Sequence, residues 1–266
     1  MLLASGEKKM TIKRWKITIE YNGAPYCGWQ RQEEGVPSVQ HAIEKAIFGF
    51  CQQDITIHVA GRTDSGVHAK AQIAHFDLDY GEREITGYEL LKAINAHLRP
   101  QPISIIGAEI VSNDFSARFD ALNKLYRYRI INRPGFLSLD YNLAWHCKKS
   151  LDPSLMNDAA QCLLGHHDFS TFRAADCQAK SPEKTLDRLD VSSFSYDDCG
   201  GQEIIIEAEA RSFLHHQVRN MVGALTLVGE GKWTKEDLES ALRAKDRKKG
   251  GPTAPAEGLY LVRVDY

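Results

Sequence analysis

The chain lacks long hydrophobic runs and cysteines at metal-ligand spacing. No apolar stretch approaches the roughly 20 residues of a membrane-spanning helix. The N-terminal stretch MLLASGEKKM has too short an apolar core for a secretory signal. The six cysteines occur without a CxxC or CxxxC spacing, which argues against a zinc framework or a redox motif. We therefore expect a cytoplasmic protein without membrane contact, whose thiols are reduced.

An excess of charge of either sign is also absent, since 33 basic residues stand against 35 acidic ones and leave a net charge of −2. Overall charge therefore does not indicate a polyanionic partner. Locally, residues 118–133 contain one acid, and the stretch RAKDRKKGG (243–251) contains five basic residues. The basic residues of the first stretch are Arg118, Lys124, Arg127, Arg129 and Arg133, interleaved with Phe119, Tyr126 and Tyr128. Such a mixture can bind RNA phosphates and stacked bases, but an ordinary solvated face is equally common for either run.

Histidine is the remaining candidate metal ligand. The ten histidines include the adjacent pairs His166/His167 and His215/His216. On a helix, adjacent side chains point about 100° apart, which suits a single metal ion poorly. We therefore expect no metal site.

Apolar periodicity in the first half predicts the order β-α-β-β-α-β. Ser38 caps the first predicted helix, and Thr86 with Glu89 forms a capping box for the second, which ends near Leu98. The predicted strands cover residues 16–22, 54–60, 70–78 and 103–111.

The second half repeats this order with one extra strand and one extra helix. Its strands are predicted at 125–131, 143–147, 187–194, 203–210 and 259–266. Asp152 with Pro153 opens one helix, a long helix runs from about Leu214 to Val228, and Thr234 caps a short one. This order of elements predicts two tandem split-βαβ units, although no residue-level repeat links the halves. The predicted fold class is α+β, a sheet type that can bind RNA.

The segment GRTDSGVHA (61–69) forms the loop between the second and third predicted strands. Gly61 and Gly66 permit tight turns and place Asp64 at a tip. An isolated aspartate in such a loop commonly accepts backbone hydrogen bonds in an Asx-turn. Arg62 favours a functional role, because a neighbouring guanidinium would lower the acid's pKa and suit it to be a nucleophile or an anchor. The DSG triplet also occurs in aspartic hydrolases, but these need a second such carboxylate, and no second DSG or DTG is present.

Five segments, in order between about Trp15 and Tyr266, resemble the tRNA pseudouridine synthase A (TruA) family. They are YNGAPYCGWQRQ (21–32), AGRTDSGVHA (60–69), FSARFDALNKLYRYRI (115–130), FLHHQVRNMVG (213–223) and TAPAEGLYLV (253–262). Two departures occur: Lys124 and Leu125 precede Tyr126 where a basic residue usually stands directly before it, and Gln217 stands where an apolar residue is common.

The resemblance implies two α+β domains whose antiparallel sheets join into one extended sheet, with the active-site cleft between them. The expected division is a disordered tail at 1–14, a domain with the catalytic loop at 15–118, and a second domain at 119–266. The implied reaction is isomerisation of uridine to pseudouridine at positions 38, 39 and 40 of the tRNA anticodon stem-loop, without cofactor or metal. The resemblance also implies a homodimer, in which a neutral average charge can conceal a basic groove. A non-catalytic RNA-binding protein of the same fold stays the alternative.

The same resemblance assigns the site residues. Asp64 corresponds to the catalytic aspartate, expected to act as nucleophile. The residues expected to bind substrate are Tyr126, Arg62, Arg219 and Leu259, and Lys124, Arg127 and Arg129 are candidates for RNA backbone contacts. Arg219 lies in an apolar helical pattern, where a buried arginine needs an acid, and Asp64 is the expected partner with Glu207 as the alternative.

Overall fold

A computed structural model describes residues 12–81 and 83–266. Residues 1–11 of the expected tail lie outside the described residues. The tail boundary at residue 14 is wrong, because strand β1 already begins at Ile12. Arg14 pairs with Asp77 at 2.7 Å and Lys16 with Glu109 at 2.7 Å, so cross-strand ion pairs extend the strand beyond its apolar alternation.

Eleven strands occur in the described residues, nine in one sheet and two in a small second sheet. Those of the large sheet are β1 (Ile12–Tyr21), β2 (His58–Val59), β3 (His68–Asp79), β4 (Ile103–Val111), β5 (Asn123–Asn132), β6 (Trp145–Cys147), β9 (Arg188–Ser195), β10 (Gln202–Ala210) and β11 (Leu259–Asp265). Its order is β4-β1-β3-β11-β5-β10-β9, with β2 on β3 and β6 on β5. The second sheet, β7 (Gly165–Asp168) with β8 (Glu183–Leu186), was not predicted. Each of its strands has only four residues, too few for a clear alternation.

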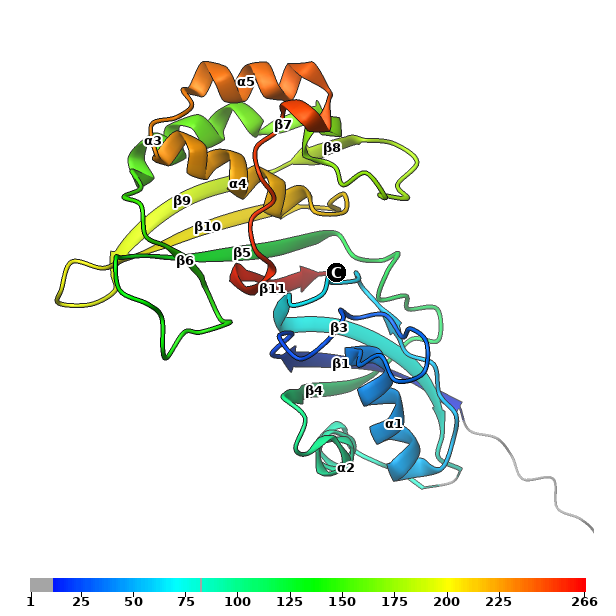
Figure 1. The fold of residues 1–266 in the computed structure, drawn as a ribbon. Coiled ribbons are helices and arrows are strands. Elements are labelled where there is room, and N and C mark those ends of the chain that lie inside the picture. Colours follow the sequence, from blue (N-terminus) through cyan, green and yellow to red (C-terminus); the bar gives the residue numbers. More distant parts are fainter. Residues whose placement is uncertain (1–11, 82) are drawn as a thin grey trace, which may run out of the picture.

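The joint between the two halves differs from the prediction. The extended sheet is present, but it is mixed rather than antiparallel, because β11 runs parallel to β3 and antiparallel to β5. The C-terminal strand therefore fills the gap between strands of the first 111 residues and strands that follow residue 122 (Figure 1).

Helices cover the sheet in both halves. They are α1 (Val39–Cys51), α2 (Gly87–Leu98), α3 (Pro153–Ala160), α4 (Gln217–Gly229) and α5 (Lys235–Ala244). The predicted caps are confirmed: Ser38 accepts from the backbone of His41, and Thr86 and Glu89 form a reciprocal capping box. In Figure 1, α1 and α2 lie beside β1 and β4, whereas α3, α4 and α5 lie over the second half. Within the described ranges, no helix is long and apolar enough to cross a membrane.

Helix α4 begins three residues later than predicted. His216 has φ of 61° and ψ of 5°, a left-handed conformation that ends the preceding loop before the helix starts at Gln217. The side chain of Gln217 accepts from the backbone N–H of Leu214 at 2.8 Å, so this departure from the family pattern stabilises the turn that precedes the helix. His215 and His216 are therefore loop residues whose side chains do not follow helical spacing.

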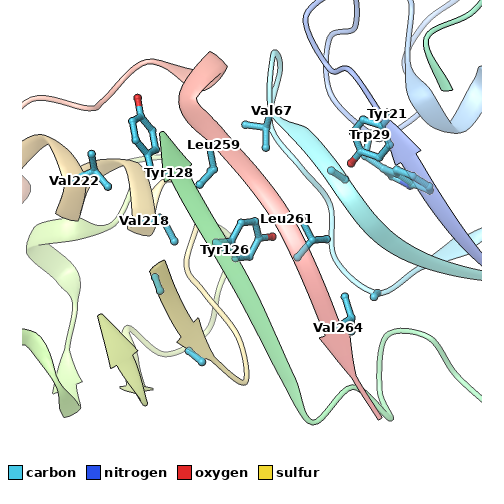
Figure 2. Packing of buried hydrophobic residues seen from close by; sticks show 14 of the residues in the cluster. Tyr21, Trp29, Val67, Tyr126, Tyr128, Val218, Val222, Leu259, Leu261 and Val264 are labelled. Atoms are coloured by element: carbon cyan, nitrogen blue, oxygen red, sulfur yellow. The ribbon is translucent and has the colours of Figure 1, made fainter. Parts of the chain in front are cut away.

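One row of residues crosses the joint between the halves. Ala69 on β3 pairs with Leu261 on β11, which in turn pairs with Tyr126 on β5. Figure 2 shows Tyr126 and Leu261 side by side at this joint, and both belong to the buried apolar cluster. The strand β3 starts directly after the loop that carries Asp64, so the register fixes where that loop lies relative to Tyr126.

Candidate active site

The loop between β2 and β3 is held in place by the segment that follows β1. The Tyr21 hydroxyl is 2.8 Å from Thr63 Oγ1, and the backbone N–H of Trp29 donates to the Thr63 carbonyl at 3.0 Å. Gly66 has φ of +77°, a conformation that suits glycine, whereas Gly61 does not need one. Burial raises the pKa of Tyr21 to about 12, so its hydroxyl stays protonated and available to Thr63. These contacts join the segments YNGAPYCGWQRQ (21–32) and AGRTDSGVHA (60–69) into one structural unit.

Three basic side chains surround the Asp64 carboxylate. Arg219 donates from Nη1 to Oδ2 at 3.2 Å, and His216 Nε2 lies 3.3 Å from the same oxygen. His215 Nε2 lies 3.3 Å from Oδ1. The Asp64 side chain retains 22% exposure, so it is accessible from one side. In the part of the chain that the structure describes, no second carboxylate contacts Asp64, unlike the paired carboxylates of an aspartic hydrolase.

The expected contact between Arg219 and Asp64 is present. The Arg219 guanidinium also donates from Nε to the Ala254 carbonyl at 2.8 Å, so α4 and the segment before β11 orient it together. Glu207, the alternative partner, instead pairs with Arg127 and Arg188. Two orienting bonds on one planar guanidinium fix its direction.

Close backbone approach brings α4 to the segment before β11. A Cβ atom on Gly223 would lie 1.7 Å from the Pro252 carbonyl oxygen, which no side chain allows. Arg247 bridges the same contact, donating to the Gly251 carbonyl at 2.8 Å and to Asn220 Oδ1 at 3.1 Å. This arginine of the RAKDRKKGG stretch therefore has a structural role.

Tyr126 and Leu259 are both buried at the edge of the site. The Tyr126 ring meets Phe213 edge to face, with ring centroids 5.3 Å apart. Burial raises the pKa of Tyr126, and the negative charge of Asp64 contributes in the same direction. The hydroxyl is consequently neutral at physiological pH. Leu259 is 6% exposed and pairs in register with Tyr128.

The predicted basic contacts separate into two groups. Arg127 pairs with Glu207 and Arg129 with Glu203, each at 2.6 Å, so carboxylates on β10 already neutralise both. Lys124 makes no ion pair among the described residues. Its side chain lies against Gly61, with Cε 3.4 Å from the position of a Cβ there.

Lys124 belongs to a group of cations near the catalytic loop. Burial lowers the pKa of Lys124, and the charges of Arg118 and Arg211 lower it further, which places both arginines near it. Arg62, Arg118 and Arg211 are exposed. In the part of the chain that the structure describes, none of the three has an acidic partner, and the expected contact of Arg62 with Asp64 is not formed.

The two histidines beside Asp64 were not predicted as site residues. They lie in the same segment as Arg219, FLHHQVRNMVG (213–223). That segment was predicted to be helical from Leu214, and adjacent side chains on a helix point apart. Burial lowers the pKa of His216, while Asp64 opposes the shift. Asp64, His215 and His216 place possible ligand atoms within 4.8 Å of one another, a geometry compatible with a metal ion. The Arg219 guanidinium on the same carboxylate opposes a cation there and favours an ion-pair cluster.

Comparison with known proteins finds consistent matches. A family model described as tRNA pseudouridine synthase matches residues 17–120 and 159–266. A tRNA pseudouridine synthase A from Paramagnetospirillum magneticum is 53% identical over 255 residues, which cover 96% of this chain and 96% of that protein. A protein of the same description from Rhodopseudomonas palustris is 54% identical over 255 residues, covering 96% and 100%. Asp64, Arg219 and Leu259 lie inside the matched ranges of the family model, and Tyr126 lies between them.

Proposed function

Because this chain belongs to the tRNA pseudouridine synthase family, we propose that it isomerises uridine to pseudouridine at positions 38, 39 and 40 of the tRNA anticodon stem-loop. The C1′–N1 bond breaks, the uracil turns, and C5 bonds to C1′ and loses its proton, while N1 gains a proton. The product has the same atoms and oxidation state as the substrate, so the reaction consumes no oxidant, reductant or cofactor.

The observation that carries this proposal is the Asp64 carboxylate between Arg219, His215 and His216. Asp64 acts as the nucleophile, because its three basic neighbours contact both carboxylate oxygens and orient the group. One side stays accessible, so a flipped nucleotide can reach the carboxylate. Oδ1 has a single contact among the described residues, from His215, so it retains capacity to accept a further hydrogen bond.

Tyr126, Leu259 and Arg62 bind the substrate base in this proposal. The Tyr126 ring stacks on the extruded uracil, and its neutral hydroxyl is a hydrogen-bond donor rather than a base. Leu259 closes the apolar side of the pocket. Arg62 is exposed and unpaired in the described chain, so it is free to contact the stem-loop as the base leaves its stack.

Of the three residues predicted to contact the RNA backbone, Lys124 is the best supported. It has no acidic partner among the described residues, whereas Arg127 and Arg129 are neutralised by glutamates. Arg118 and Arg211 add positive charge beside it. A phosphate bound by these cations would therefore lie beside the loop that carries Asp64.

The active site lies where two domains meet in the proposed architecture. A division between residues 118 and 119 assigns Asp64 to the first domain and Tyr126 and Arg219 to the second. The strand pairing of β11 on β3 supports a cleft at this boundary. The proposal locates the enzyme in the cytoplasm with its tRNA.

The functional form that we propose is a homodimer. Exposed apolar side chains on the β5–β6 connection and near the end of β9 support it: Phe136 (78% exposed), Leu139 (89%), Tyr141 (71%) and Phe194 (58%). Large apolar side chains left this exposed can become buried in a contact between two copies of the chain. Sedimentation of the protein with and without Leu139→Asp tests it; dimers lost only in the variant support the proposal, and a monomeric wild type contradicts it.

Mapping of pseudouridine in treated tRNA tests the substrate. Three tRNA transcripts are used, each with uridine at one of the positions 38, 39 and 40 and another base at the other two. Each is incubated with the enzyme, and the modified position is located by pseudouridine-specific derivatisation. Modification of all three supports the proposal. Modification confined to another arm of the tRNA contradicts it, and binding without modification identifies a non-catalytic RNA-binding protein.

A further inference from the structure

A second carboxylate reaches the active site through His215. Asp176 lies in the segment between Ser170–Phe172 and β8, and its Oδ1 is 3.0 Å from His215 Nδ1. The opposite ring nitrogen, Nε2, is 3.3 Å from Asp64 Oδ1. The imidazole therefore bridges two carboxylates, one at the rim and one in the site.

This bridge fixes the orientation of the His215 ring. Carboxylates accept hydrogen bonds, so Asp176 presents an acceptor to Nδ1 and Asp64 presents one to Nε2. The charge of His215 lowers the pKa of Asp176, which favours the ionised carboxylate at this end of the bridge. Arg219, Asp64, His215 and Asp176 then form a row in which basic and acidic side chains alternate.

The backbone around Asp176 is docked on the same histidine. Ala174 donates its N–H to the His215 carbonyl at 3.0 Å, and His215 donates its own N–H to Cys177 Sγ at 3.4 Å. The backbone N–H of Cys177 donates to the Ala174 carbonyl at 3.1 Å, which closes a turn. Because backbone bonds hold the turn, the Asp176 side chain is not needed to keep it in place.

The two oxygens of Asp64 are restrained differently. Arg219 and His216 contact Oδ2, while His215 is the one side chain on Oδ1 in the described structure. Without the His215 contact, the carboxylate would be held at one oxygen and could rotate about its Cβ–Cγ bond. A carboxylate held at both oxygens keeps the geometry that nucleophilic attack requires.

We propose that Asp176 is a positioning residue, which holds the His215 ring against Asp64 Oδ1 and thereby orients the Asp64 carboxylate for reaction. The inference rests on the proposed function, because orientation of Asp64 matters only if Asp64 reacts. The Asp176 side chain is exposed and reaches Asp64 through His215 rather than directly. Its effect is therefore on the chemical step rather than on affinity for tRNA.

Single-turnover rates and tRNA affinities of Asp176→Asn test this role. We expect the rate to fall by about tenfold, as for other residues that orient a catalytic group, while the Kd for tRNA changes less than twofold. Asp176→Glu should recover part of the rate, because it restores the charge opposite Nδ1. Asp198→Asn is the charge-matched control, since Asp198 is exposed and has no ion pair within the described residues, and it should leave the rate unchanged.

A double-mutant cycle separates action through His215 from an independent effect. If Asp176 acts through the imidazole, Asp176→Asn combined with His215→Asn should be no slower than His215→Asn alone. An unchanged rate in Asp176→Asn, additive losses in the double variant, or a rate loss matched by weaker tRNA binding would each overturn the proposal. Failure of the proposed function itself is distinguishable, because the wild type would then form no pseudouridine.

Discussion

Arg219 donates to the Asp64 carboxylate at 3.2 Å across 155 positions of sequence. The contact joins α4 to the loop between β2 and β3, and the second guanidinium bond to the Ala254 carbonyl adds the segment before β11. Three of the five segments that resemble the family therefore meet at a single side chain.

Replacement of Arg219 should reduce catalysis strongly. In Arg219→Gln the carboxylate loses its guanidinium partner and the orientation it provides, and we expect the single-turnover rate to fall about 100-fold or more. Arg219→Lys keeps the charge but cannot donate to Asp64 and Ala254 from one planar group, so it should recover little of the rate. Full activity in Arg219→Lys would show that charge alone is sufficient.

The contact between α4 and the segment before β11 should tolerate no side chain at Gly223. In Gly223→Ala the new methyl group would lie 1.7 Å from the Pro252 carbonyl oxygen, so the backbone must shift. We expect the free energy of unfolding to fall by about 1–3 kcal/mol. Denaturant titration measures it, with Gly135→Ala as the matched control because nothing lies within 4 Å of its Cβ position. Equal stability of the two variants would contradict the close approach.

Acid should destabilise the fold through His68. This histidine is fully buried, its Nδ1 accepts from the Gly23 N–H at 3.1 Å, and burial lowers its pKa from 6.5 to about 4. The unfolded chain therefore binds more protons between these two values, so the contribution is fully present above about pH 6.5 and is lost as the pH falls towards 4. The difference corresponds to about 3 kcal/mol.

Unfolding of wild type and His68→Gln at pH 7 and pH 4.5 checks this contribution. Glutamine does not titrate, so the variant should lose less stability between the two pH values. His75, whose pKa burial also lowers, acts in the same direction in both proteins and cancels in the comparison. Parallel losses in the two proteins would exclude His68 as the source.

Binding of tRNA should depend on salt through Lys124. We expect log affinity to fall with log salt concentration by about 0.7 to 0.9 per phosphate contact. Lys124→Gln should reduce this slope by about one contact, whereas Lys45→Gln, an exposed lysine on α1, should leave it unchanged. Affinity independent of salt would rule out an electrostatic contact with the RNA backbone.

The sequence predicted local features of the fold, and one long-range contact of the site, but not the partners of the strand residues. Local signals such as the Ser38 cap and the Thr86 capping box are encoded within a few residues, and both are present. The contact of Arg219 with Asp64 was predictable because a buried arginine needs an acid. The partners of Arg127 and Arg129 were not, because they depend on the register of β5 against β10.

The positions of His215 and His216 and the pairing of β11 with β3 could not be predicted from the sequence, for a different reason. A single left-handed residue, His216, turns the chain so that two adjacent side chains face one carboxylate, and helical periodicity contains no sign of this. Asp176 comes from a segment 39 residues away in sequence. The parallel pairing of β11 with β3 likewise depends on a long-range contact between the end of the chain and the catalytic loop.

Release of tritium from tRNA labelled at C5 of uridine tests the central claim most directly. Wild type and Asp64→Asn are compared at saturating enzyme, with tRNA binding measured for both. Release by wild type alone, with equal binding, is the predicted result, because C5 loses its proton only if the glycosidic bond is remade. Equal release by Asp64→Asn, or none from wild type that binds the tRNA, would contradict the role of Asp64 in this reaction.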